Sequence, residues 1–403
     1  MNTTLPALSP TKGQSGPRPK VNRVRDHRHK GLGYVPHLFY IHKMNDPIPI
    51  SKDRRPGRAA TSNATNRFDR LTRTEVTDGW DRDEDLPPLR THVRDEVPRR
   101  VISENTSPDL SFERSINPYR GCEHGCIYCY ARPSHAYLGL SPGLDFETEL
   151  IARPTAPTVL EAELRVRGYV PKVIAIGTNT DPYQPIEKDR QIMRGLLAVL
   201  AAFNHPVAIT TKGTLIERDI DILAPMAAKG LVRVGISVTT LDPATSRAME
   251  PRVPAPLRRL QTIRRLTDAG IPVRVMVSPV VPALTDHELE PILAAAAAAG
   301  AIAASSIILR LPREVSGLFQ DWLAEAYPDR AARIMGRVRE LHGGQDYDPA
   351  FGKRMTGQGE WARLMKRRFD LACGRLGLAY RLPPLRTDLF ARPAQKGDQL
   401  SLF

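Results

Sequence analysis

The sequence predicts an α/β fold: a partial (β/α)6 barrel with parallel strands, C-terminal helices behind it and a disordered arm in front. From about residue 110, short β-branched runs alternate with helical stretches, and this rhythm is typical of a parallel sheet. The runs are apolar along most of their length, as expected for strands covered on both faces. About six strand–helix units suit an open partial barrel better than a closed eightfold one. A doubly wound open sheet is the structural alternative.

The predicted elements follow one another in a regular order. Six runs are predicted to be strands: residues 111–117, 173–177, 207–211, 232–238, 273–277 and 306–309. Apolar residues recur at helical spacing between them, which predicts helices at 189–203, 215–229, 256–269 and 285–300. Beyond Pro312 three further helices are predicted, at 316–327, 329–342 and 361–374.

Composition divides the chain into four predicted parts. These are a disordered basic arm, a barrel core, a helical subdomain and a flexible tail, over residues 1–105, 106–312, 313–385 and 386–403 respectively. The arm is rich in Pro, Arg, Asp and Ser and lacks apolar periodicity, so it cannot bury enough surface to fold alone. Two interpretations fit this composition equally well. The arm could bind nucleic acid, or it could be an extension without function, with Met44 as a later start codon.

The charge of the chain bears on its partners. Its 403 residues carry a net charge of +14, and the sequence pI is about 9.8. Such an excess favours a polyanionic partner such as nucleic acid, although an arginine-rich composition from a GC-rich genome would produce it too. No apolar run reaches the length of a membrane span, and the first residues lack the apolar segment of a secretory signal. With only four cysteines, the protein is predicted to be cytoplasmic.

Three of the four cysteines lie within eight residues, as Cys122, Cys126 and Cys129. Three thiolates on one short loop can converge on a metal centre. A structural zinc site would need a fourth ligand, which would have to be His124, His135 or the distant Cys373. An iron–sulfur cluster held by three cysteines would keep one iron open for chemistry. The odd local count argues against a disulfide, and Cys373 is predicted to be a buried small side chain.

Polar residues follow successive predicted strands. Thr178 and Asn179 come directly after the run at 173–177, Lys212 follows the run at 207–211, and Ser237 lies at the end of the run at 232–238. In barrels of parallel strands, chemistry gathers at the carboxyl ends. Each residue alone could simply complete a turn or satisfy local backbone. Together they predict a polar mouth to the barrel.

The spacing Cys-x3-Cys-x-aromatic-Cys resembles the signature of the radical S-adenosylmethionine (SAM) superfamily. The resemblance implies a [4Fe–4S] cluster held by Cys122, Cys126 and Cys129, with SAM bound at the open iron and cleaved reductively to a 5′-deoxyadenosyl radical. It also implies a partial (β/α)6 barrel of the TIM type. The aromatic residue before the third cysteine lies near the adenine in that family, and here it is Tyr128.

Further residues resemble the branch of this superfamily related to spore photoproduct lyase. They are the tyrosine after the third cysteine, Thr180-Asp181-Pro182-Tyr183-Gln184-Pro185, the Thr-Lys-Gly at the end of the run at 207–211, and Glu250-Pro251-Arg252. The resemblance covers about residues 112–312. It implies that Lys212 and Ser237 contact SAM, with Thr178 and Asn179 as further contacts from the second strand.

One departure concerns the hydrogen-atom donor. The lyase uses a further cysteine near its second strand, and residues 168–181 contain none here. Tyr130 is retained where the lyase has a tyrosine in its radical relay, so Tyr130 is the candidate catalytic residue. The expected function is therefore a radical SAM enzyme, possibly a lyase, that acts in DNA repair. Modification of RNA or protein is an alternative, and a non-catalytic, metal-stabilised nucleic-acid-binding protein is a third.

The last residues suggest a protein partner. Gln399, Leu400, Ser401, Leu402 and Phe403 resemble the motif that binds the bacterial sliding clamp. Short apolar anchors at a free chain end suit a pocket on another protein. The cluster also requires an electron donor, such as a flavodoxin or ferredoxin.

Overall fold

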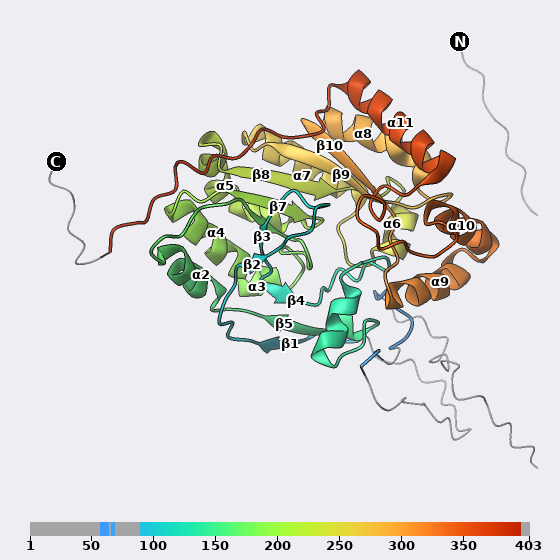
Figure 1. Cartoon of the computed structure of the whole chain (residues 1–403), viewed down its shortest axis with the longest axis horizontal. Helices are drawn as coiled ribbons and strands as arrows, with labels where there is room; N and C mark the ends of the chain where they lie inside the picture. The colour runs from blue at the N-terminus through green and yellow to red at the C-terminus, as the bar shows by residue number, and fades with distance from the viewer. Residues whose placement is uncertain (1–56, 64–65, 69–88, 396–403) are drawn as a thin grey trace, which may run out of the picture. The chain divides into compact units, whose positions relative to one another are not determined.

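The computed structural model describes residues 57–63, 66–68 and 89–395. The chain divides into two compact units, residues 1–46 and 47–403, and all described residues belong to the second. That unit is built on a seven-stranded sheet, with the strand order β10-β9-β8-β7-β6-β3-β2 (Figure 1). The strands are β2 (Ser103–Glu104), β3 (Arg114–Ile116), β6 (Ile174–Ile176), β7 (Val207–Thr211), β8 (Val232–Ser237), β9 (Val273–Val280) and β10 (Ala303–Ile308).

Six of these strands form the predicted parallel array. From β3 to β10 every neighbouring pair is parallel, and only the short β2 pairs with β3 in the antiparallel direction. The spatial order follows the sequence order without a reversal, whereas a doubly wound sheet reverses at a switch point. Right-handed crossovers then place every connecting helix on one face of the sheet. The partial (β/α)6 barrel is confirmed, and the doubly wound alternative is wrong.

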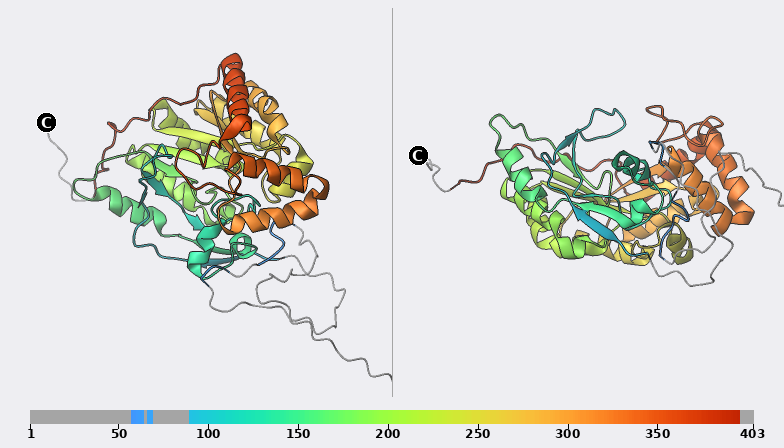
Figure 2. Two further views of the ribbon diagram at one scale, coloured as in Figure 1. Left: turned by 45° about the vertical axis from the view of Figure 1, so that its right-hand side comes forward. Right: turned by 90° about the horizontal axis from the view of Figure 1, so that it is seen from below.

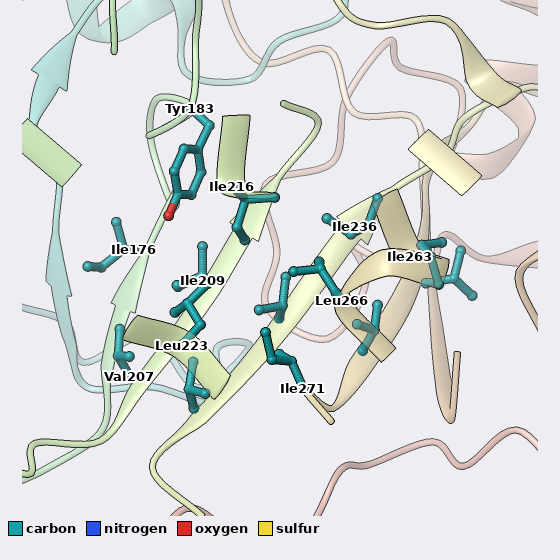
Figure 3. Close-up of a cluster of buried hydrophobic side chains, with 14 of the residues drawn as sticks. Ile176, Tyr183, Val207, Ile209, Ile216, Leu223, Ile236, Ile263, Leu266 and Ile271 are labelled. Atoms are coloured by element: carbon teal, nitrogen blue, oxygen red, sulfur yellow. The ribbon is translucent and has the colours of Figure 1, made fainter. Parts of the chain in front are cut away.

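The connecting helices lie where the sequence periodicity predicts them. They are α4 (Ile192–Ala202), α5 (Ile220–Ala228), α7 (Pro256–Asp268) and α8 (Leu289–Ala298), with shorter helical turns α3 (Glu187–Arg190), η2 (Thr214–Asp219), α6 (Pro243–Met249) and η3 (Asp286–Glu288). Apolar side chains from the sheet and the helices interleave between the two layers, as Figure 3 shows for Ile209, Leu223 and Leu266. Each of these three side chains is at most 1% exposed, so this core fixes the frame from which the strand ends project.

A second, three-stranded sheet lies beside the barrel (Figure 2). Its order is β1-β5-β4, formed by His92–Asp95, Glu149–Ala152 and Tyr119–Arg120. Three helical segments surround it: η1 (Arg132–Leu138), α1 (Asp145–Thr148) and α2 (Ala156–Arg165). The chain leaves β4 directly into the three-cysteine segment and returns through η1, so this small sheet carries both ends of the segment.

The C-terminal helices share cores with the barrel. They are α9 (Glu314–Ala326), α10 (Pro328–Leu341) and α11 (Gly359–Leu376). Helix α11 contributes Phe369 and the fully buried Cys373 to the main core. Helices α9 and α10 pack in a second core that includes Ile127 and Tyr128 of the cysteine segment. The residues after Pro312 therefore pack on the barrel rather than around a core of their own.

The predicted disordered arm is wrong for residues 57–63, 66–68 and 89–105. Ala59 and Ala60 are at most 5% exposed, and their N–H groups donate to the Glu147 carboxylate. The N–H groups of Val101 and Ile102 donate to Glu163 in the same way. These segments lack periodicity because carboxylates of the barrel unit, the buried Glu147 and the partly buried Glu163, hold them in place of an amphipathic face. The rest of the predicted arm, residues 1–56, 64–65 and 69–88, lies outside the described residues.

The predicted flexible tail is wrong for residues 386–395. The Arg386 N–H donates to the carbonyl of Gly230, and that of Ala391 donates to the carbonyl of Phe203. The Phe390 ring lies 5.5 Å from the Tyr169 ring and 6.1 Å from the Phe203 ring, measured between centroids. This segment is therefore part of the fold. The clamp-like motif at residues 399–403 lies outside the described residues.

His205 lies beneath Phe390 and gives the fold a testable pH dependence. Its side chain is fully buried, one ring nitrogen bonds the Tyr169 hydroxyl at 2.8 Å, and burial lowers its pKa from 6.5 to about 4. Because the unfolded chain binds this proton more readily, stability is complete above pH 6.5 and falls between pH 6.5 and 4. The full loss from this group is about 3 kcal/mol.

The free energy of unfolding, measured by urea titration across pH 4–7.5, tests this expectation. A His205→Gln variant serves as the control, because it removes the titrating group. The wild type should lose more stability than the variant between pH 6.5 and 4. Parallel pH profiles for the two proteins would contradict a buried neutral histidine.

The described residues include no helix that is long and apolar enough to cross a membrane.

Candidate active site

The three cysteines lie on a tight segment between β4 and η1. Gly121 and Gly125 adopt φ values of +76° and +64°, which favour glycine. A Cβ atom at Gly121 would lie 2.6 Å from the Leu150 side chain, and one at Gly125 would lie 2.7 Å from the Glu147 carboxylate. The segment is thus pressed against the small sheet and α1. Cys122, Cys126 and Cys129 line the same cavity.

A buried ion pair shapes this segment. Arg132 and Glu147 have fully buried side chains, and an Arg132 guanidinium nitrogen lies 2.6 Å from the Glu147 carboxylate. The same guanidinium donates to the carbonyls of Gly125 and Cys126, each at 3.0 Å. It also donates to the carbonyls of Pro142 and Gly143 on the opposite side. Arg132 therefore holds the backbone between the first and third cysteines, a role that sequence spacing does not reveal.

The cavity opens at the carboxyl ends of the parallel strands. It encloses about 950 Å³ including its mouth. Lining residues come from the loop after β6 and from β7 to β10 with the residues that follow them, and they include Asn179, Lys212, Ser237, Met276, Ser278, Ile307 and Arg310. The cysteine segment supplies Tyr128 and Tyr130 beside the three thiols. The structure therefore brings together eight of the nine predicted site residues, whose roles remain predictions.

Thr178 is the exception. It is not among the residues that line this cavity, and its backbone carbonyl accepts a hydrogen bond from the Tyr130 hydroxyl. The sequence places Thr178 correctly in the loop after β6 but cannot tell which of two adjacent side chains faces inward. Asn179 faces the cavity, and its backbone N–H bonds to the Asn117 side chain at 3.1 Å.

Lys212 and Ser237 form a connected polar wall. The Lys212 ammonium donates to the Ser237 hydroxyl at 3.1 Å, and this hydroxyl donates to the Ser278 carbonyl at 3.1 Å. The ammonium also lies 5.8 Å from the centre of the Tyr128 ring. These contacts leave donor capacity on an ammonium that can make three hydrogen bonds. The wall therefore offers positive charge to an anionic group in the cavity.

Asp181 anchors the loop after β6 at the cavity floor. Its carboxylate accepts from the Thr211 hydroxyl at 2.6 Å and the Lys212 N–H at 2.7 Å, and it lies 3.3 Å from the His124 ring. Burial acts to raise the pKa of Asp181, but His124 and these hydrogen bonds outweigh it and lower the pKa to about 2. Asp181 is therefore ionised and fixes His124 and Lys212 in place.

A second buried network supports Tyr128 and the end of β8. Glu250 accepts hydrogen bonds from the Tyr128 hydroxyl and, at 3.0 Å, from the Thr239 hydroxyl. Its other oxygen lies 2.8 Å from Arg259, and both side chains are fully buried. Arg259 also donates to the carbonyl of Ser237 at 3.0 Å. The network thus ties the aromatic residue of the cysteine segment to the end of β8. The sequence shows Glu250 only as part of a short motif and gives no signal for Arg259.

Comparison with known proteins identifies this arrangement. The sequence profile of the Radical SAM superfamily matches residues 116–296. An uncharacterized protein of Mycobacterium tuberculosis is 40% identical over 248 residues, which are 61% of this chain and 72% of that protein. The chain belongs to the radical SAM superfamily. An uncharacterized Methanocaldococcus jannaschii protein is 25% identical over 173 residues, which are 43% of this chain and 62% of that protein.

Solved structures show that this radical SAM fold resembles spore photoproduct lyase, as the sequence predicted. The lyase in complex with dinucleoside spore photoproduct matches with a TM-score of 0.53 and 16% identity, covering 72% of this chain and 81% of the lyase. A variant with bound AdoMet and the same dinucleoside ligand matches with a TM-score of 0.52 and 15% identity over the same shares. At this identity the likeness concerns the fold.

Radical SAM enzymes use a [4Fe–4S] cluster and SAM, and the donor set of this chain fits the cluster. The described residues include no group of three His, Cys, Asp or Glu side chains close enough to hold a single metal ion. A cubane cluster instead needs its three thiols apart, one on each of three irons. Neither His135 nor Cys373 is among the residues that line the cavity shared by the three thiols, so neither is placed to complete a zinc site with them.

The electrostatics of the thiols support this fit. Burial raises the pKa of Cys122, and Asp181 and the neighbouring thiols raise it further. Burial and Glu250 likewise raise the pKa of Cys126. A cationic centre between the thiols, such as a bound iron cluster, would stabilise the thiolate forms of Cys122 and Cys126 against this shift. Because the superfamily consists of enzymes, the non-catalytic alternative is wrong.

Proposed function

We propose that this radical SAM enzyme reductively cleaves SAM and acts on a damaged or modified nucleotide in DNA. One observation carries the first half of the proposal: the three cysteine thiols and the polar ends of successive strands line one cavity. When bound, the cluster and SAM supply a 5′-deoxyadenosyl radical that can abstract a hydrogen atom. The residues of the chain bind and orient these groups and restrict water.

The chain's residues divide this work. Cys122, Cys126 and Cys129 line the cavity and would hold the cluster, which would leave one iron open to bind SAM. The Lys212 ammonium, beside the Ser237 hydroxyl, binds the carboxylate of SAM, and Asn179 offers an amide to the same ligand. Tyr128 is 7% exposed and its hydroxyl is held by Glu250, so its ring would be placed to contact the adenine of bound SAM.

Lys212→Met should weaken SAM binding without unfolding the protein. A hydrogen bond to a charged group contributes about 1.5–3 kcal/mol, so we expect the Kd for SAM to rise about 10- to 150-fold. Equilibrium binding of SAM to the reconstituted enzyme measures this. Lys229→Met is the matched control, because Lys229 bonds Asn204 at 2.8 Å outside the cavity. An unchanged Kd in Lys212→Met would remove Lys212 from the SAM site.

Tyr130 is the proposed hydrogen-atom relay. Its ring lines the cavity and is 47% exposed, and its hydroxyl carries the O–H hydrogen close to the loop after β6. Tyr130→Phe keeps the ring and removes this hydrogen. We expect product formation from the true substrate to fall by at least about tenfold, with 5′-deoxyadenosine still released. Equal product yields from the variant and the wild type would contradict the relay.

The DNA half of the proposal rests on the net charge of +14 and on the likeness to a lyase solved with a dinucleoside photoproduct. A base inside a duplex would have to be flipped out to reach the cavity. The test supplies reconstituted, reduced enzyme and SAM with irradiated DNA, plain DNA, RNA or peptide, and measures 5′-deoxyadenosine together with changes in the substrate. If irradiated DNA is the only one of these four substrates that raises the yield of 5′-deoxyadenosine, the result supports DNA repair. A higher yield of 5′-deoxyadenosine with RNA or peptide would assign that alternative substrate instead.

Two partners and the location of the enzyme belong to the same proposal. Residues 399–403 would bind the sliding clamp, and a flavodoxin or ferredoxin would deliver the electron in the cytoplasm. Deleting residues 399–403 should abolish binding to purified clamp and leave SAM cleavage intact. If the shortened chain and the full chain bind the clamp with equal affinity, the clamp proposal is wrong.

A further inference from the structure

Exposed aromatic rings and arginines extend from the cavity mouth across the surface. We call this surface the aromatic strip, and it consists of Tyr130, Arg310, Arg313, Tyr137, Phe68 and Arg67. Its members come from the cysteine segment, the segment between β10 and α9, η1, and residues 66–68. Figure 1 shows the blue segment that includes residues 66–68 beside the start of α9. Segments far apart in sequence therefore meet at one place next to the cavity.

The inner end of the aromatic strip belongs to the cavity mouth. The Arg310 guanidinium lies 4.5 Å from the centre of the Tyr130 ring, and both residues line the cavity. Arg310 follows β10, and Arg313 lies three residues further along the same segment. Arg313 donates to the Tyr137 hydroxyl at 3.4 Å. This segment connects the cavity to the outer rings.

The outer end pairs two exposed rings. Tyr137 is 68% exposed and Phe68 is 55% exposed, with 5.3 Å between their ring centroids. The Arg67 guanidinium lies 4.7 Å from the Phe68 centroid and 4.9 Å from the Tyr137 centroid. Arg67 is itself held by an ion pair to Glu314 at 2.7 Å and by the Pro133 carbonyl. The rings are therefore held in place while both side chains remain more than half exposed to solvent.

The aromatic strip carries net positive charge. Glu314 neutralises Arg67, whereas Arg310 and Arg313 form no ion pair with a carboxylate in the part of the chain that the structure describes. Arg313 and Arg67 also lower the pKa of Tyr137, which reports a positive potential at its hydroxyl. Clustered exposed rings are unusual on a protein surface without a partner. Rings flanked by arginines match the stacking and phosphate contacts of single-stranded nucleic acid.

We propose that an unpaired nucleic-acid strand binds along the aromatic strip, with bases stacked on Tyr137 and Phe68 and phosphates on Arg313 and Arg310. The strand then presents one nucleotide to the cavity beside Tyr130. This inference rests on the proposed function, since it names the form of nucleic acid that the enzyme accepts. An acidic protein surface would use the same charge but not the base stacking, so the two are separable by experiment.

The test measures binding of a fluorescent 12-nucleotide single strand to the reconstituted full chain by anisotropy. Phe68→Ala, Tyr137→Ala and the double variant remove the rings. From the usual effect of losing one stacked base, we expect each single variant to bind about 5- to 150-fold more weakly. Tyr380→Ala, which removes a ring that is 54% exposed on another surface, should bind like the wild type. Thermal unfolding of each variant confirms that the exposed substitutions leave the fold intact.

The outcomes separate this proposal from the proposed function. Wild-type-like binding by the double variant would overturn the aromatic strip, even if the wild type cleaves SAM. So would equal affinity for polyglutamate, because charge alone would then account for binding. Ring-dependent binding in an enzyme that does not cleave SAM would support the aromatic strip and overturn the proposed catalysis.

Discussion

Arg132→Met should lower the free energy of unfolding by about 3–5 kcal/mol and leave the chain unable to retain a full cluster. The Glu147 carboxylate is fully buried and lies 2.6 Å from Arg132, so the variant leaves this carboxylate without its cationic partner. It also removes the donors to the Gly125 and Cys126 carbonyls, which lie between the cluster ligands. Urea unfolding measures the first effect, and iron content after anaerobic reconstitution measures the second.

A double variant separates the two effects. Arg132→Met combined with Glu147→Met removes both charges, so the part of the loss that comes from the unpaired carboxylate should return. The part that comes from the Ala59 and Ala60 N–H groups, which lose their acceptor, should not. Iron content should remain low, because the carbonyls still lack their donors. If Arg132→Met unfolds at the wild-type urea concentration and binds a full complement of iron, the ion pair does not shape the cysteine segment.

Glu250→Ala should destabilise the protein by a similar amount, about 3–5 kcal/mol, and weaken SAM binding as well. It leaves the Arg259 guanidinium, which is fully buried, without a carboxylate 2.8 Å away. It also frees the Tyr128 hydroxyl and disturbs the contact of Arg259 with the Ser237 carbonyl. Tyr128 and Ser237, which both line the cavity, should therefore become less fixed together. Urea unfolding and the Kd for SAM measure the two consequences.

The matched control is Glu217→Ala. Glu217 also binds arginines, Arg258 at 2.5 Å and Arg265 at 2.6 Å, but these arginines are partly exposed and Glu217 does not line the cavity. Its loss should cost less stability and leave the Kd for SAM unchanged, since water can solvate the arginines. Equal effects of Glu217→Ala and Glu250→Ala on SAM binding would show that Glu250 has no positioning role.

The features that sequence predicts here are those with a local pattern. The β-branched runs at 207–211 and 232–238 became β7 and β8 almost residue for residue, because strands buried on both faces must be apolar throughout. Parallel strands have their carboxyl ends at the same edge of the sheet, so the sequence correctly predicted that Lys212 and Ser237 lie together. The cysteine spacing identified the superfamily because three ligands on one segment need a fixed separation.

Other features depend on contacts between distant residues and leave no local pattern. Arg58 donates to the Glu147 carbonyl across 89 residues, so the segment at 57–63 resembled a disordered arm. Phe390 packs on Phe203, yet its Pro-rich surroundings resembled a flexible tail. Glu250 and Arg259 lie on different elements, and only folding shows that they face Tyr128. The sequence therefore did not predict the contacts that buried polar groups make with residues far away in the chain.

Electron paramagnetic resonance of the reduced protein, with and without SAM, tests the central claim most directly. The claim is that three cysteines hold a [4Fe–4S] cluster whose open iron faces a SAM-binding cavity. The account predicts the signal of a reduced [4Fe–4S] cluster that changes when SAM is added, is retained in Cys373→Ala and is lost in Cys126→Ala. A signal that SAM leaves unchanged, or one that persists without Cys126, would contradict it.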